Sequence, residues 1–157
     1  PLPEAQLDRF MMKLSLGLPS KEEELAIMDR FMQEDPLKGL IPVADLPQIL
    51  EVKKAVNQVF VHPEVEKYMV EIVAATRERT RVVMGVSPRG TLALLRSAKA
   101  YAALMGRGYC TPDDVKTLAV PVLAHRIKLS YGCQTDQEAQ TLIREILGEV
   151  PVPAETI

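Results

Sequence analysis

Apolar residues recur along most of this chain at the three- or four-residue spacing of an amphipathic helix. Proline, glycine and capping residues separate the apolar segments, so the pattern divides into a series of helices. The predicted helices open at Ser20, Asp45, Pro63, Ser87, Thr111 and Thr135. In the first, one face carries Leu25, Met28, Phe31 and Met32. In the second, the side chains expected to face inward are Ile49, Val52, Val56, Val59 and Phe60. The pattern therefore predicts an all-α fold.

Local signals mark where these helices begin and end. Ser20 and Glu23 have the spacing of a capping box, and Thr111 is followed by a proline and two acidic residues that suit a first helical turn. Thr135 has the same capping character ahead of the last helix. Pro121 is expected to bend or break the helix that opens at Thr111.

Only residues 11–16 are predicted to form a strand, because apolar and polar residues alternate there. A lone strand is not stable, so its partners are expected in residues outside this chain or in another chain. The chain also opens with Pro1 rather than with methionine. Both features suggest a piece of a larger protein.

The composition fits a helical globular domain. Of 157 residues, 47% are hydrophobic but only 4% are aromatic, so the core must consist of Leu, Val, Ile, Ala and Met. The net charge of −2 argues against nucleic acid or an anionic membrane as a partner, and there is no membrane-spanning apolar run. Cys110 and Cys133 form no CxxC pair, which is typical of reduced thiols in a cytosolic protein.

The segment that carries most chemistry is Ser87-Pro88-Arg89. Ser87 can cap a helix, and Pro88 suits the first helical position, where no amide hydrogen is needed. Arg89 would then lie beside the free amides at the positive end of the helix dipole, an arrangement that suits an anion such as phosphate. An ordinary surface arginine is the alternative.

Gly85 and Gly90 have the glycine spacing of a P-loop, but Thr91 stands where the lysine must be. Proline and arginine between the glycines would also disturb a nest of backbone amides. This chain is therefore not expected to cradle a triphosphate and its metal by itself.

Further arginines are candidates for anion binding. Arg9 ends a short predicted helix, where it could be an exposed residue paired with Glu4 or Asp8, or could reach the phosphate of a neighbour. A positive patch is also predicted, for which a solvated surface and a phosphate-facing role are both open: Arg77, Arg79, Arg81, Arg89 and Arg96. His125 is expected to be structural, with a hydrogen bond to the backbone.

Several segments together resemble the MoxR family of AAA+ ATPases: residues 2–10, 17–20, 85–90, 109–116 and 125–127. The resemblance runs in order from residue 1 to about residue 130 and covers the C-terminal part of such a protein. It implies that residues 1–18 are the end of the AAA+ nucleotide-binding core, 19–150 a helical lid, and 151–157 a tail.

The resemblance also implies roles for individual residues. Arg9 matches the arginine finger, which would enter the ATP site of the neighbouring subunit, and Arg89 matches the sensor-2 arginine of the lid. Ser87 and Pro88 would lie with Arg89 on the phosphate side of ATP. Whether Arg89 acts in its own subunit or in the next stays open.

For the parent protein, the resemblance implies a cytoplasmic ATPase that uses ATP and Mg²⁺ and assembles as a homo-oligomeric ring, commonly a hexamer. Such proteins act as chaperones in maturation or metal-cofactor insertion, often with a von Willebrand A-domain partner. Walker A, Walker B and the magnesium ligands are not in this chain, so we expect it to be inactive alone. Two other classes remain as alternatives. One is a helical module that binds an acidic partner, and the other is a nucleic-acid binder, which the net charge disfavours.

Overall fold

The computed structural model describes residues 3–33, 35–130 and 136–154. The elements follow one another in this order: α1 (Glu4–Leu7), α2 (Lys21–Gln33), the 3₁₀ turn η1 (Pro36–Gly39), α3 (Leu46–Gln58), α4 (Pro63–Arg77), β1 (Val82–Met84), α5 (Pro88–Leu104), α6 (Pro112–Leu123), the 3₁₀ turn η2 (Ala124–Arg126), β2 (Lys128–Leu129) and α7 (Asp136–Glu149). The predicted helical fold is confirmed. Among the described helices, none has the combined length and apolarity that a membrane span requires.

The chain divides into two compact units, each of which is described by itself. The smaller unit is Leu14–Lys53, and the larger combines Pro1–Lys13 with Lys54–Ile157. This division follows internal contacts and does not mark where a nucleotide-binding core would end. The predicted domain limits at residues 18 and 150 therefore stay predictions.

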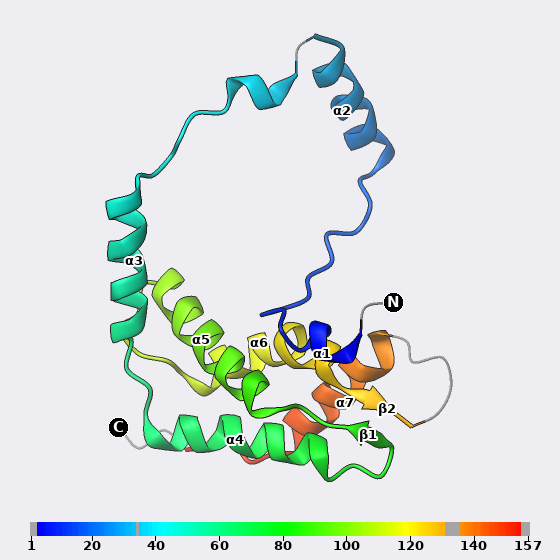
Figure 1. Cartoon of the computed structure of the whole chain (residues 1–157), viewed down its shortest axis with the longest axis vertical. Coiled ribbons are helices and arrows are strands. Elements are labelled where there is room, and N and C mark those ends of the chain that lie inside the picture. The colour runs from blue at the N-terminus through cyan, green and yellow to red at the C-terminus, as the bar shows by residue number, and fades with distance from the viewer. Residues whose placement is uncertain (1–2, 34, 131–135, 155–157) are drawn as a thin grey trace. The chain divides into compact units, whose positions relative to one another are not determined.

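The core of the larger unit lies between helices α4, α5, α6 and α7 (Figure 1). Helix α5 packs along α6 and against α4, and α7 closes the bundle against α4 and α6. Aliphatic side chains fill the interior, and the largest fully buried ones include Met69, Ile72, Leu94, Leu123, Leu142, Ile143 and Ile146. Burial of this apolar surface is the main force that holds the four helices together.

The predicted helix starts are confirmed where the structure describes them. Each of α2, α3 and α6 opens with reciprocal side-chain and backbone hydrogen bonds, which satisfy amides that have no partner inside the helix. In α6, for example, Thr111 N donates to the Asp114 carboxylate at 2.8 Å. Pro121 lies inside α6, and the helix passes into the tighter turn η2 three residues later. The cap predicted at Thr135 lies outside the described residues.

The prediction that the apolar face of α3 turns inward is wrong for most of its residues, since Ile49 is 49% exposed and Val52 and Phe60 are exposed to 60% each. The apolar face of α2 is exposed as well, with Leu25 at 62% and Phe31 at 60%. Val59, just after α3, is buried at 6%. Helical spacing shows that one face is apolar, but it does not show what covers that face. In the smaller unit, no described layer covers it.

The structure also differs from the strand predicted at residues 11–16, which contain no assigned strand. Strand geometry needs hydrogen bonds from a neighbouring strand, and here the Lys13 amide donates to the Pro121 carbonyl at 2.8 Å instead. The described strands are β1 and β2, which pair antiparallel through Val82 with Leu129 and Met84 with Lys128. They contain three and two residues, too few for an alternating pattern to be visible in the sequence.

Candidate functional site

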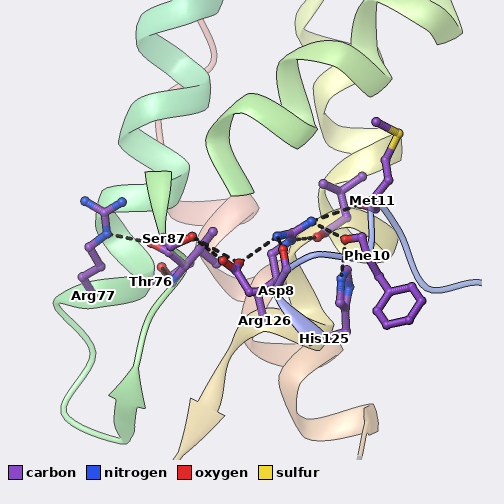
Figure 2. Close-up of polar contacts among 10 residues, drawn as sticks. Asp8, Phe10, Met11, Thr76, Arg77, Ser87, His125 and Arg126 are labelled. Atoms are coloured by element: carbon purple, nitrogen blue, oxygen red, sulfur yellow. Dashed lines mark hydrogen bonds and ion pairs between the residues drawn. The ribbon is translucent and has the colours of Figure 1, made fainter. Parts of the chain in front are cut away.

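The connection from β1 into α5 is held from both sides by the end of α4. The Val86 amide donates to Thr76 Oγ1 at 3.0 Å, and Arg77 Nε donates to the Val86 carbonyl at 2.8 Å (Figure 2). A Cβ atom at Gly85 would come within 2.8 Å of the Arg77 side chain. The start of α5 is therefore fixed on the core by a short, closely packed loop.

The second glycine of this segment is also required by packing. A Cβ atom at Gly90 would lie 2.2 Å from Val86 Cγ1 and 3.1 Å from Arg126 Cδ. Neither Gly85 nor Gly90 has a positive φ angle, so the two glycines do not form a left-handed turn. Close helix packing accounts for the P-loop-like spacing, in agreement with the rejection of a P-loop from the sequence.

Ser87 stands at the N-cap of α5 but does not cap it. No hydrogen bond joins its side chain to the first turn, and its Oγ instead donates to the carboxylate of Asp8 at 3.0 and 3.1 Å (Figure 2). The capping bond expected from the sequence is therefore wrong. A hydrogen bond donated to a charged carboxylate is strong, which explains why the Ser87 hydroxyl is directed toward Asp8.

The same carboxylate pairs with a buried arginine. The side chain of Arg126, which is 1% exposed, donates from Nη1 to Asp8 Oδ1 at 2.7 Å and also contacts the Asp8 carbonyl. Its Nη2 donates to the Phe10 carbonyl at 2.5 Å, and its Nε donates to the Val122 carbonyl at 2.8 Å. A buried cation needs such a complete set of acceptors to offset its lost hydration.

His125 supports the same N-terminal segment. Its Nε2 lies 3.2 Å from the Phe10 carbonyl, which confirms the structural role expected for this residue (Figure 2). Because a carbonyl can only accept, the neutral ring must carry its proton on Nε2. Burial lowers the pKa of His125, although the bond to Phe10 partly opposes that shift.

The residues with candidate chemistry meet in an open hollow of about 460 Å³ beside this network. Arg9, Pro88 and Arg89 line it together with Arg96 and Arg126, and Ser87 is not part of its lining. Within the described residues, no ion pair or side-chain hydrogen bond occupies Arg9, Arg89 or Arg96. Several cations that share a hollow without a counter-ion favour an anionic ligand.

The positive patch predicted from the sequence is divided in the structure, which corrects that prediction. Arg79 pairs with Glu149 and Arg81 with Glu145, both on α7. The hydrogen bond between Arg79 and Glu149 raises the pKa of the arginine and lowers that of the glutamate. With Arg77 bonded to Val86, only Arg89 and Arg96 of the five predicted residues line the hollow.

The hollow supplies cations rather than metal ligands. Across the ranges that the structure describes, no three His, Cys, Asp or Glu side chains gather closely enough to hold a metal ion. The nearby carboxylate of Asp8 is already engaged by Arg126 and Ser87. The arrangement is therefore suited to the oxygens of a phosphate and not to its magnesium.

The connection between Asp8 and Arg126 was not predicted from the sequence. The two residues are 118 positions apart, and no local pattern relates them. The signal that was available is an arginine at the end of a strongly apolar helix, where a buried charge requires a partner.

This chain is similar to a known domain family and to several known proteins. The model of the AAA lid domain family matches residues 74–146. Two similar proteins are the uncharacterized protein YeaC of Bacillus subtilis, 40% identical over 99% of this chain, and the chaperone MoxR1 of Mycobacterium tuberculosis, 36% identical over 98%. These alignments cover 49% and 43% of the two relatives, so the chain spans about half their length or slightly less.

A solved structure is similar over the same extent. It is the crystal structure of a "putative ATPase" from Cytophaga hutchinsonii, with a TM-score of 0.85 and 35% sequence identity. The match covers 98% of this chain and 50% of the other. The fold and the order of elements are therefore shared with that structure.

Proposed function

Because this chain belongs to the MoxR-type AAA+ proteins and carries their lid domain, we propose that its arginine hollow binds the phosphates of ATP in a longer ATPase. The observation that carries the proposal is the meeting of Arg9 and Arg89, 80 positions apart, in one hollow without a counter-ion among the described residues. Both side chains are exposed, so their guanidinium groups are free to approach a ligand.

In this proposal the two arginines act on the same phosphoryl group. Phosphoryl transfer places negative charge on the equatorial oxygens of the γ-phosphate, and fixed cations lower the barrier by stabilising that charge. If Arg9 reaches into the site of a neighbouring subunit, then Arg89, in the same hollow, reaches into that site as well. The geometry therefore favours sensor-2 action in trans. Pro88 lines the hollow beside Arg89.

The rest of the machinery would belong to the longer protein. A P-loop core would bind ATP and Mg²⁺, and a homo-oligomeric ring would bring each hollow to a neighbour's nucleotide. The compact unit that carries both Arg9 and Arg89 would move as a body with the nucleotide state. The name of the mycobacterial relative supports a chaperone role. We propose maturation or metal-cofactor insertion in a partner, with a von Willebrand A-domain protein as the candidate.

The first test is ATP turnover by the full-length protein that carries this chain. Arg9→Ala and Arg89→Ala should each lower kcat about 100-fold, since each removes one preorganised cation from the developing charge. Arg144→Ala is the matched control, because this arginine lies on the surface of α7 and, among the described residues, bonds to Gln140 on its own helix. Turnover near wild type in either of the first two variants would remove the proposed role.

The second test asks whether the arginines work across an interface. Subunits with Arg9→Ala are mixed with subunits that lack a working Walker A motif, so that neither parent ring can hydrolyse ATP. Mixed rings should recover part of the activity, because an intact ATP site then meets an intact Arg9. The same mixture with Arg89→Ala should also recover activity if both arginines act in trans. If activity recovers in the mixture that contains Arg9→Ala but not in the one that contains Arg89→Ala, then Arg89 acts on the ATP of its own subunit.

The acidic-partner alternative makes a different prediction for the same hollow. A module that binds an acidic segment would lose partner binding in Arg89→Ala without any change in ATP turnover. Comparing the two readouts on one variant therefore distinguishes a nucleotide role from a protein-docking role.

A further inference from the structure

Two of the four arginines that line the hollow, Arg9 and Arg89, are connected by three polar side chains. Asp8 precedes Arg9 directly, and Ser87 precedes Arg89 by two positions. The Asp8 carboxylate accepts a hydrogen bond from Ser87 Oγ at 3.0 Å and from Arg126 Nη1 at 2.7 Å (Figure 2). One carboxylate thus joins the backbone turn that carries Arg9 to the first turn of the helix that carries Arg89.

Arg126 fixes the backbone on both sides of Arg9. Its guanidinium donates to the carbonyls of Asp8 and Phe10, the residues before and after Arg9, and at 3.4 Å to that of Met11. The Arg9 side chain itself remains exposed. A fixed backbone under a free cation is the arrangement needed to present a charge at a defined place.

The N-terminus of helix α6 provides a comparison for Ser87 at the N-terminus of α5. Helices α5 and α6 both open with a hydroxyl residue followed by proline. Thr111 caps α6 with a complete capping box, whereas Ser87 leaves the first turn of α5 without a side-chain cap. Ser87 gives up its usual capping role and bonds to a carboxylate that is distant in sequence. This departure indicates that Ser87 serves a contact outside its own helix.

We propose that Ser87, Asp8 and Arg126 form a positioning relay that holds Arg9 and Arg89 at a fixed spacing, so that both reach one phosphoryl group. The relay rests on the proposed function, because the spacing matters only if the two cations share a ligand. Its members are positioning residues: Ser87 and Asp8 do not line the hollow, and the guanidinium of Arg126, which does line it, is already bonded to Asp8 and to the Phe10 carbonyl. A displacement of about 1 Å at a reacting centre can lower a rate about 100-fold, so a relay of hydrogen bonds is sufficient to control turnover.

The test uses the full-length protein and the Ser87→Ala variant. We expect kcat to fall 10- to 100-fold with KM changed less than threefold, since ATP still binds but the cations are misplaced. Ser87→Thr, which keeps the hydroxyl, should restore most of the loss. Thr111→Ala is the matched control, because it removes a true cap and should lower the melting temperature while kcat per folded subunit stays within twofold.

A double-mutant cycle separates positioning from general destabilisation. If Ser87 acts through the two cations, Ser87→Ala should have less than a twofold effect in a variant that already carries Arg9→Ala and Arg89→Ala. A full, multiplicative loss in that background would overturn the relay. So would a normal kcat in Ser87→Ala while Arg9→Ala is slow. A normal kcat in Arg9→Ala would instead remove the proposed function itself.

Hydrogen exchange on this chain gives an independent readout. The amides of Arg9 and Phe10 donate to the carbonyls of Gln6 and Leu7 at 3.0 and 3.1 Å. Ser87→Ala and Asp8→Asn should speed exchange at these two amides at least fivefold, while amides in α6 and α7 exchange as in wild type. Unchanged exchange in both variants would show that the carboxylate does not hold this turn.

Discussion

Replacement of Gly90 by alanine tests the packing on which the hollow depends. The added Cβ would lie 2.2 Å from Val86 Cγ1, whereas carbon atoms in contact normally stay about 3.5–4.0 Å apart. Val86 is fully buried, so it has no free space into which to turn. The other neighbour is Arg126, whose Cδ would be 3.1 Å away. Relief of the clash therefore requires a shift of α5 or of this arginine.

Two opposing effects determine how much Gly90→Ala changes the free energy of unfolding. Overpacking of a dense interior costs about 1–3 kcal/mol, and the better helix propensity of alanine returns about 1 kcal/mol at most. A contact of 2.2 Å places the steric cost in the upper part of its range, at about 2–3 kcal/mol, so Gly90→Ala should lower the free energy of unfolding by about 1–2 kcal/mol. For a chain of this size, the melting temperature should fall by roughly 2–8 °C.

The assay is thermal and urea denaturation followed by far-ultraviolet circular dichroism. Gly148→Ala is the matched control, because this glycine is also helical and a Cβ there would meet nothing within 4 Å. It should leave stability unchanged or raise it by up to about 1 kcal/mol. If Gly90→Ala melts as high as Gly148→Ala, the close approach of α5 to Val86 is wrong.

Two further predictions concern pH. Burial raises the pKa of Asp114, but its hydrogen bonds to Arg107 and to the backbone outweigh that effect and leave the pKa below its usual value. The resulting stability is present above the unfolded-state pKa of about 3.9 and is lost as pH falls through the lower folded-state value. Asp114→Asn should therefore lower the free energy of unfolding by about 2 kcal/mol at pH 7. In urea denaturation, the variant should also lose less stability than wild type as the pH falls through this range. The lowered pKa of His125 means that the unfolded chain takes up a proton more readily than the folded chain, so stability should decline as pH falls below about 6.5. His125→Gln should reduce the difference in urea midpoint between pH 7.5 and pH 5.5, and an undiminished difference would assign the effect to another group.

The helices could be predicted because their signals are local. Ser20, Asp45 and Thr111 each find a partner three residues away, and the structure contains all three reciprocal caps. The same rule was wrong at Ser87, where the hydroxyl bonds to a carboxylate 79 positions away. Local rules describe competition within one turn of helix, and they do not include partners that only the fold brings near.

The candidate site was only partly visible in the sequence. Arg9 and Arg89 were candidates because of their places at predicted helix ends, the family resemblance suggested their roles, and the structure places both in one hollow. The sequence could not reveal that Arg79 would pair with Glu149, which removes it from the positive patch. Charge that is continuous in sequence becomes divided in space, since each side chain of a loop can turn toward a different neighbour.

The tight turn that follows Pro121 limits how this protein can vary. Within a helix each residue advances the side-chain direction by about 100°. A single insertion or deletion between Pro121 and Arg126 would therefore swing the guanidinium away from the carbonyls beside Arg9, even if every side chain were retained. In this short segment the number of residues should be under stronger selection than their identity. When the segment is aligned between related proteins, its length is therefore a better guide than its residue types.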